Sequence, residues 1–214
     1  MPEYHQIQTT VACEPSRFPE MAERFARVLR EIGCSSPALD TWIAALHWEG
    51  AELAEGVARP WIGFELAGAG LTAAPCVISG GPDIYPRFSG TWVQFDLLFE
   101  SASIEDNSRF PEVRFEPGLA PALWTAVSAF ADGFPDHGVF LTNEWSDGRP
   151  WEGMVEGDAE KLWSFDLGLV PEAMAPLFAA VPETHWSRRE DGRLAFADRR
   201  SWSAPPWMES VDDR

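Results

Sequence analysis

The chain has 214 residues, with 34 acidic and 16 basic side chains and a formal net charge of -18 at pH 7. Such a charge repels phosphate backbones and anionic lipid headgroups, so direct binding to nucleic acid or to a membrane surface is not expected. A chain of this size, 45% hydrophobic, buries a sizeable core in one domain and needs neither a disulfide framework nor a structural metal.

The cysteines and the first residues indicate the compartment. Cys13, Cys34 and Cys76 are widely spaced and form no Cys-x-x-Cys pair. This is typical of reduced cytosolic thiols and not of a zinc or dithiol site. The first residues contain no basic stretch followed by an apolar one, so no secretory signal is predicted. Because no apolar run approaches the roughly 20 residues that cross a bilayer, we expect a cytoplasmic protein.

The first third of the chain predicts one strand and two helices. The strand is expected at about residues 6–12. Over residues 16–33, apolar side chains recur at helical spacing and Gly33 stands where a glycine would end the helix. A second helix is expected over residues 35–56, because Pro37 stands at a favoured first helical position.

Strand patterns take over after Arg59. Extended segments are predicted at 61–67, 75–79 and 90–101, separated by Gly, Pro and Asp. The third of these alternates apolar with mixed residues, as a sheet does when one face covers the core. A polar loop follows, and residues 111–117 predict a short edge strand between prolines.

The second half of the chain mixes helices and strands. The expected elements are a helix at 118–134, strands at 138–145, 151–157 and 161–168, a helix at 171–183, and strands at 184–190 and 193–199. The last two strands should form a hairpin, because Asp191 and Gly192 stand between them.

Helices therefore come in separate blocks between runs of strands, which is typical of an α+β domain with a mainly antiparallel sheet. We expect about six to eight strands, with about four helices packed chiefly on one face of the sheet. A single domain over 1–214 is predicted, with a two-lobed split near residue 117 as the alternative. Residues 203–214 should pack loosely, because they combine adjacent prolines with an acidic end.

Signatures of catalysis or metal binding are weak. The stretch GAGLTA, residues 68–73, fits the G-x-G-x-x-A turn of dinucleotide-binding folds. However, Pro75 and a further strand follow it, in place of the helix whose N-terminus would bind the pyrophosphate. No G-x-S-x-G elbow is present, and His, Cys and Asp do not fall at recognised metal-ligand spacing. We therefore predict no catalytic residue, no cofactor and no metal.

The region from residue 132 to residue 172 is the most informative, because it carries ten acidic side chains against two basic ones and three tryptophans. Within it, residues 143–153 (NEWSDGRPWEG) predict a hairpin in which Trp145 and Trp151 pair across the strands. Aromatic side chains ringed by acidic ones suit recognition of a cationic surface. The candidate interaction residues are Glu144, Trp145, Asp147, Arg149, Trp151, Glu152, Glu156 and Asp158.

Two functions are compatible with this pattern. The first is a non-enzymatic acidic protein that engages a basic protein partner, as an inhibitor or a toxin-immunity protein would. In composition and size, though through no motif, the chain resembles small acidic cytosolic proteins that neutralise bacterial toxins. The alternative is an enzyme or small-ligand-binding protein with a pocket around Trp145, Trp151 and His137, with Asp136 beside it. Ordinary turn usage also explains the stretch that holds Asp136 and His137.

Overall fold

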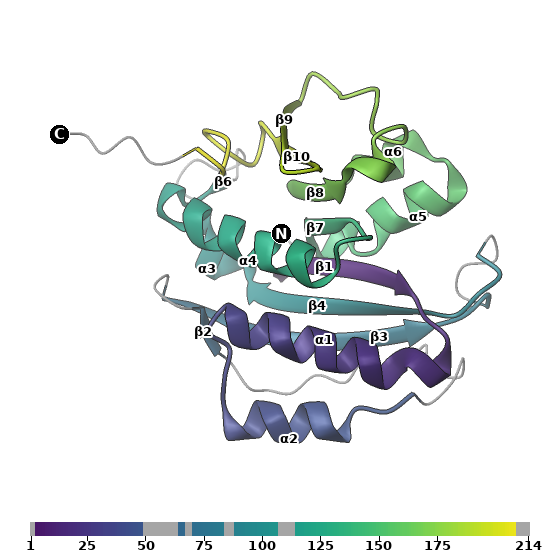
Figure 1. Ribbon diagram of the computed structural model, residues 1–214. Helices are drawn as coiled ribbons and strands as arrows, with labels where there is room; N and C mark the ends of the chain where they lie inside the picture. The colour runs from purple at the N-terminus through teal and green to yellow at the C-terminus, as the bar shows by residue number, and fades with distance from the viewer. Residues whose placement is uncertain (1–2, 49–63, 67–69, 84–87, 107–113, 209–214) are drawn as a thin grey trace.

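The computed structural model describes residues 3–48, 64–66, 70–83, 88–106 and 114–208. Its centre is an eight-stranded sheet in the order β2-β3-β4-β1-β7-β8-β10-β9, in which each pair of neighbours is antiparallel (Figure 1). The strands are β1 (Tyr4–Ala12), β2 (Phe64–Leu66), β3 (Leu71–Gly80), β4 (Trp92–Glu100), β7 (Val139–Asn143), β8 (Leu167–Pro171), β9 (His185–Glu190) and β10 (Arg193–Asp198). A second small sheet pairs β5 (Glu105–Asp106) with β6 (Arg114–Phe115). The predicted α+β class and mainly antiparallel sheet are confirmed.

Two long helices, α1 (Phe18–Glu31) and α4 (Ala120–Gly133), cover one face of the sheet, and α2 (Pro37–Ala45) packs beside α1 (Figure 1). Helices α1 and α4 approach each other closely at Gly133 of α4, where an added Cβ atom would lie 2.2 Å from Val28 Cγ2 of α1. The remaining short elements on this side and at the sheet ends are η1 (Pro15–Arg17), α3 (Ser101–Ile104) and η3 (Pro117–Leu119). No helix in the described part of the chain is both long and apolar enough to span a membrane.

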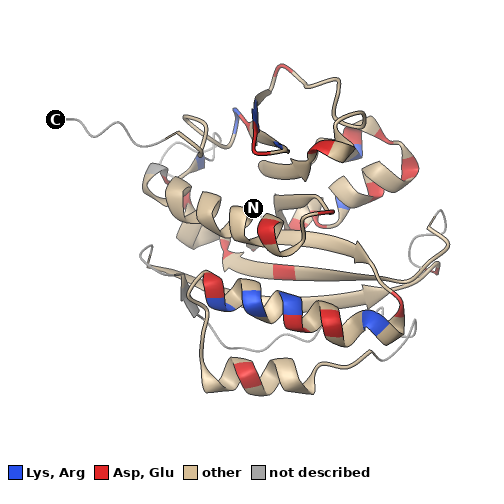
Figure 2. Cartoon of the chain, in the orientation of Figure 1, with Lys and Arg blue, Asp and Glu red and all other residues tan. Residues whose placement is uncertain are grey.

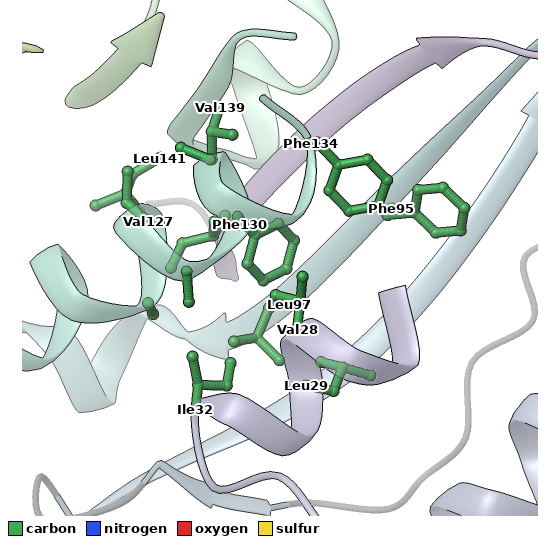
Figure 3. Close-up of a cluster of buried hydrophobic side chains, with 14 of the residues drawn as sticks. Val28, Leu29, Ile32, Phe95, Leu97, Val127, Phe130, Phe134, Val139 and Leu141 are labelled. Atoms are coloured by element: carbon green, nitrogen blue, oxygen red, sulfur yellow. The ribbon is translucent and has the colours of Figure 1, made fainter. Parts of the chain in front are cut away.

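The main core lies between these helices and the sheet. Phe25 of α1 packs against Phe95 of β4 with ring centroids 4.8 Å apart, and meets Phe130 of α4 edge-on at 5.8 Å. Phe134, which follows α4, also stacks on Phe95, with ring centroids 5.4 Å apart (Figure 3). Each of these rings is at most 1% exposed. Full burial of an aromatic side chain contributes about 2–3 kcal/mol, so this cluster fixes how the helices lie on the sheet.

Alternate residues of the same strands point to the opposite face of the sheet. There Phe140 of β7, Val170 of β8 and Phe196 of β10 belong to a second, smaller apolar cluster. Two short helices, α5 (Arg149–Glu156) and α6 (Ala159–Leu162), pack against this cluster through Met154 and Leu162. The long helices thus lie on one face, and the short helices lie on the other.

Several predicted elements are confirmed. The helix predicted at 118–134 is α4, and the strand predicted at 90–101 is β4. The C-terminal hairpin is formed by β9 and β10, with Asp191 at φ 49 and Gly192 at φ 74. Two successive residues with positive φ match the right-handed twist of the flanking strands.

The second predicted helix, over residues 35–56, begins at Pro37 as expected, with Ser36 Oγ accepting the Leu39 amide at 3.1 Å. It ends earlier, at Ala45. Residues 49–56 lie outside the described residues, as do the first three residues of the strand predicted at 61–67.

The hairpin predicted at residues 143–153 and the strand predicted at 151–157 are both wrong. After β7 the chain forms a 3-10 turn, η4 (Glu144–Ser146), and then α5. Gly148 at φ 68 and Gly157 at φ 71 stand at the two ends of α5. Both adopt the left-handed conformation that glycine tolerates best, and so they set the bounds of the helix.

The cause of this error is visible in the residues of α5. Trp151, Met154 and Val155 stand at i, i+3 and i+4, which is the spacing of a helix face. Pro150 lies in the first turn, where its missing N–H costs no hydrogen bond. In a stretch this short, apolar residues fit the two-residue and the 3.6-residue period almost equally well, so the pattern does not identify the helix.

The helix predicted at residues 171–183 is also wrong. Only the 3-10 turn η5 (Glu172–Met174) forms, and irregular turns follow it to β9. Pro176 and Pro182 both lack the amide hydrogen that a helix interior requires. The strand predicted at 161–168 begins later than expected, because α6 occupies its first residues and β8 starts at Leu167.

Candidate functional site

All eight predicted interaction residues fall in one continuous stretch, residues 144–162, which we call the acidic segment. It comprises η4, α5 and α6 and connects β7 with β8. Six of its residues are acidic and two are basic, and Figure 2 shows the acidic residues along its two helices. Because α5 and α6 lie against the second face of the sheet, the segment is separated from α1 and α4 by the sheet itself.

Trp145 is the most exposed large hydrophobic residue in the described chain, at 64%. The turn beneath it is held by a reciprocal cap. Asn143 Oδ1 accepts the amides of Trp145 at 3.0 Å and Ser146 at 3.2 Å, and Ser146 Oγ accepts the Asn143 amide at 3.2 Å. Glu144 Oε2 also accepts the Glu3 amide, at 2.7 Å. The backbone that carries the exposed indole is therefore fixed before any partner arrives.

Trp151 has a different environment, and the predicted pairing of the two tryptophans is wrong. Its ring packs against Trp92 of β4 at 5.7 Å and against Phe88 at 5.2 Å, and it is half-buried. Trp151 thus holds α5 against the sheet, whereas Trp145 points to solvent. The sequence gives both indoles similar acidic neighbours, so it could not distinguish these two roles.

The carboxylates of the segment are partly engaged within it. Lys161 Nζ lies 2.8 Å from Glu152 Oε2 and 2.9 Å from Glu156 Oε2, and these two hydrogen bonds raise the pKa of Lys161. Asp158 caps α6 by accepting the Glu160 amide at 2.9 Å. Glu160 itself is 91% exposed at its side chain, with Arg149 at 3.9 Å. With six acidic and two basic residues, the segment keeps an excess of four negative charges.

A row of buried polar side chains lies beneath the acidic segment, and sequence reasoning missed it. We call it the polar socket; its members, each at most 9% exposed, are Gln6, Gln8, Thr10, Gln94, Asp96 and Thr142. The signal was present, because β1 carries a polar residue at every second position from Gln6 to Thr10. Alternation of this kind is usually attributed to a solvent-facing side of a strand, and here that side is covered.

Gln8 joins the socket to the backbone of the acidic segment. Its Oε1 accepts the Gly148 amide at 3.2 Å, and its Nε2 donates to Thr142 Oγ1 at 2.5 Å. Gly148 stands directly before α5, so this bond fixes where the helix begins. A buried polar network whose members are bonded to one another specifies one arrangement of the chain.

Gln94 makes a second connection, to a side chain of the segment. Its Nε2 donates to Asp147 Oδ1 at 2.9 Å and to Asp96 Oδ1 at 3.0 Å, and its Oε1 accepts from Thr10 at 3.3 Å. Asp147 was predicted to face a partner, whereas the structure places its carboxylate against the socket. Together with Gln8, Gln94 fixes the acidic segment from below.

Asp136 and His137, the predicted alternative pocket, lie on the other side of the molecule. Burial lowers the pKa of His137, Asp136 opposes this shift, and the charge of Arg24 on α1 adds to it. A groove of about 400 Å³ runs nearby between α1 and α4; it is lined by Arg24, Arg27, Val28, Glu31, Asp132, Gly133 and Pro135. Trp151 packs on the opposite face of the sheet, so the structure does not bring His137 together with the tryptophans.

A further polar group joins the start of β1 to α3. Ser101 Oγ lies 2.9 Å from His5 Nδ1, and Glu105 Oε1 lies 3.5 Å from His5 Nε2. Burial lowers the pKa of His5 to about 4, so its ring is neutral at pH 7. The order of groups is that of a nucleophile, a base and an acid. However, Ser101 is only 2% exposed, so its hydroxyl is closed to a substrate.

Metal and thiol chemistry find little support in the described residues. No three His, Cys, Asp or Glu side chains among them are grouped as metal ligands. Cys13, Cys34 and Cys76 are free and buried. Burial raises the pKa of Cys34 to about 11, which keeps its thiol protonated at neutral pH.

The acidic segment therefore combines one exposed indole with an excess of carboxylates on a backbone that is bonded to the sheet from below. This combination suits contact with a positively charged surface. Comparison of the chain with protein-family models, with curated proteins and with solved structures gives no match.

Proposed function

We propose that the protein is a non-enzymatic, cytoplasmic binding protein whose acidic segment engages a basic protein partner, as an inhibitor or a toxin-immunity protein does. The observation that supports this best is Trp145, which is 64% exposed on a capped turn. Leaving an indole in water is unfavourable, and burying it in a partner regains that cost. Tryptophan is also the residue type most enriched among the anchors that dominate interface energies.

The charge of the chain supports the choice of a basic partner. A net charge of -18 steers a positively charged protein toward contact and repels acidic ones. The acidic segment that carries Trp145 also carries an excess of four negative charges, so long-range attraction and the apolar anchor belong to one segment of the chain. The pairs that Glu152 and Glu156 form with Lys161 contribute instead to local shape.

Preorganisation supports the proposal independently of charge. Binding is weakened when a loop has to be ordered at the moment of contact. Here the cap of η4, the Gly148–Gln8 bond and the Asp147–Gln94 bond have already ordered the loop. The free protein therefore presents Trp145 in the orientation that a partner would meet.

The test begins by cross-linking the protein to its partners in cell extract, identifying them by mass spectrometry and purifying the one retained. Binding of that partner is then measured by surface plasmon resonance. Trp145→Ala should raise Kd by at least about 30-fold, mainly through faster dissociation. Trp186→Ala serves as the control, because that half-buried ring lies on β9 next to Arg199. Equal affinity of the Trp145 variant and the native protein would contradict the proposal.

A matched pair of charge reversals tests the electrostatic part. Glu160 in the acidic segment and Glu23 on α1 are both exposed, and each lies near one arginine, at 3.9 Å and 3.6 Å. Glu160→Lys should slow association several-fold at low salt, whereas Glu23→Lys, with the same change in net charge, should alter it little. If both reversals slow association equally, then only the overall charge acts and the acidic segment is not the contact surface.

A further inference from the structure

The chain between β8 and β9 carries an exposed apolar stretch. We call residues 173–182 (AMAPLFAAVP) the apolar loop; none of its side chains carries a charge, a hydroxyl or an amide. Leu177 is 49% exposed and Val181 is 38% exposed, and they are two of the four exposed large hydrophobic residues in the described chain. Ala179 and Ala180, which lie between them, are exposed as well. Neighbouring apolar side chains left in water are typical of a contact surface.

The apolar loop is held in one conformation by the residues beneath it. The Phe178 amide donates to the Ala175 carbonyl at 3.1 Å. The Phe178 ring is 2% exposed and stacks on Phe196 of β10 with centroids 5.5 Å apart. Because this ring is anchored in the second apolar cluster, the loop does not have to be ordered when a partner arrives. The free protein therefore presents Leu177 and Val181 ready for contact.

The apolar loop lies next to the acidic segment. Trp163 directly follows that segment, and its ring meets Phe178 edge-on with centroids 5.4 Å apart. Met154 of α5 and Met174 of the loop also pack against the same apolar cluster. The loop and the segment therefore cover the same face of the sheet. An uncharged apolar patch thus adjoins a segment with an excess of four negative charges.

These two neighbouring surfaces favour one kind of partner. The acidic segment attracts lysine and arginine side chains and repels acidic ones. The apolar loop gains from apolar side chains only, because a polar group buried against it would lose its hydrogen bonds to water without replacement. A second copy of the chain carries the same net charge of -18, which opposes self-association. The surface that complements both parts is therefore amphipathic, cationic on one side and aliphatic on the other.

We propose that the apolar loop and the acidic segment together bind an amphipathic basic segment of the partner. Its cationic side chains contact the acidic segment, and its aliphatic side chains cover Leu177 and Val181. This inference rests on the proposed function, to which it adds a second part of the contact surface and the chemistry of the partner segment.

Two synthetic peptides of lysine and leucine test this by isothermal titration calorimetry. In the first peptide leucine recurs at helical spacing, so that the helix has one apolar and one basic face. The second peptide has the same composition in an order that gives no apolar face. The native protein should bind the first peptide about tenfold more tightly, because only this peptide buries both exposed side chains of the loop. The double variant Leu177→Ser, Val181→Ser should lose this preference and bind the second peptide as the native protein does.

Met208→Ser is the matched control. Met208 is 58% exposed, and Trp207 beside it packs on Trp124 of α4, on the opposite face of the sheet. This variant should bind both peptides as the native protein does. The proposal is overturned if the native protein binds the two peptides equally or binds neither, if the double variant keeps the preference, or if Met208→Ser loses it as well. Should the double variant not fold, Leu177→Ser alone replaces it, with a smaller loss of preference expected.

Charge reversals separate this inference from the proposed function. Glu160→Lys should weaken the binding of both peptides more than Glu23→Lys does, because the charge contact does not depend on an apolar face. If the two reversals act equally, the acidic segment is not the contact surface and both proposals fail. If they differ but the double variant keeps the preference, only the role of the apolar loop is overturned. A native protein that sediments as a dimer, with the double variant as a monomer, would place a second copy on the loop and overturn that role too.

Discussion

The side-chain amide of Gln94 serves two carboxylates that belong to distant parts of the chain. It donates to Asp96 two residues away and to Asp147 of the acidic segment. A single buried donor shared in this way couples the position of the segment to the register of β4. Loss of a hydrogen bond to a charged group in a buried setting costs more than loss of one between neutral groups.

We therefore expect Gln94→Met to lower the free energy of unfolding by about 2 kcal/mol, because both carboxylates lose this donor. Thr10→Val is the matched variant, since it removes only the 3.3 Å bond to the carbonyl of Gln94 and should cost about 1 kcal/mol or less. Urea unfolding of the native protein and both variants gives the comparison. Equal losses would mean that the carboxylates gain nothing from the amide.

At the residue scale, the sequence predicted where the notable side chains cluster but not which way each one faces. The acidic segment lies within residues 132–172, the region that the sequence marks by its acidic residues and tryptophans. The outward position of Trp145 and the inward position of Asp147 depend on η4 and on Gln8 and Gln94, which are far away in the sequence. Local pattern carries no information about such partners.

At the scale of elements, the approach of α5 to α6 depends on Gly153. A Cβ atom at this position would lie 2.3 Å from the Leu162 amide nitrogen and 2.6 Å from its Cα. Backbone atoms cannot give way as the end of a flexible side chain can. The two helices therefore pack this closely only because residue 153 has no side chain.

Gly153→Ala should for this reason destabilise the protein by at least about 2 kcal/mol, although alanine is the better helix former. Gly118→Ala is the control, because a Cβ atom there meets nothing within 4 Å. Thermal unfolding of the two variants is the measurement. A Gly153 variant as stable as the Gly118 variant would show that α6 moves aside at little cost.

Long elements were predicted better than short ones, for a physical reason. The two 14-residue helices α1 and α4 each repeat the apolar spacing over several turns, which no strand pattern imitates. The eight-residue α5 and the three-residue η5 offer too few repeats. In these, glycines with positive φ and prolines set the structure, and a pattern of apolar residues could not identify it.

At the scale of the whole molecule, Asp166 and His5 give stability opposite dependences on pH. Burial raises the pKa of Asp166 to about 7, so its contribution is greatest at low pH and is lost as pH rises from about 4 to about 7. Burial lowers the pKa of His5 to about 4, so its contribution is greatest above about pH 6.5 and is lost as pH falls toward 4. Between pH 4 and pH 6.5 the two effects oppose each other.

Single variants should separate the two effects. Relative to the native protein, His5→Gln should gain stability as pH falls from 6.5 to 4, and Asp166→Asn should gain stability as pH rises from 4 to 7. Each change is on the order of 3 kcal/mol. Chemical unfolding at several pH values measures both, and taking differences from the native protein cancels the many exposed carboxylates. Parallel slopes for the two variants would contradict the assignment.

The overall architecture was largely predictable from the sequence, because separate blocks of helices and strands permit few arrangements. The order of strands was not. β1 lies in the middle of the sheet between β4 and β7, and its pairing with β4 joins residues at least 80 positions apart. The polar socket exists only because β1 and β4 are neighbours, so it could not be predicted before the topology was known.

Because the acidic segment is held by contacts on its inner side, the residues on its outer side are free to change. The atoms that hold it are mostly the Gly148 backbone, the Asn143–Ser146 cap and the Asp147 carboxylate, whereas Trp145 and Glu160 face outward. Outward residues can therefore be exchanged in evolution or by directed mutagenesis with little effect on folding. One scaffold of this kind could be retargeted from one ligand to another by a few substitutions.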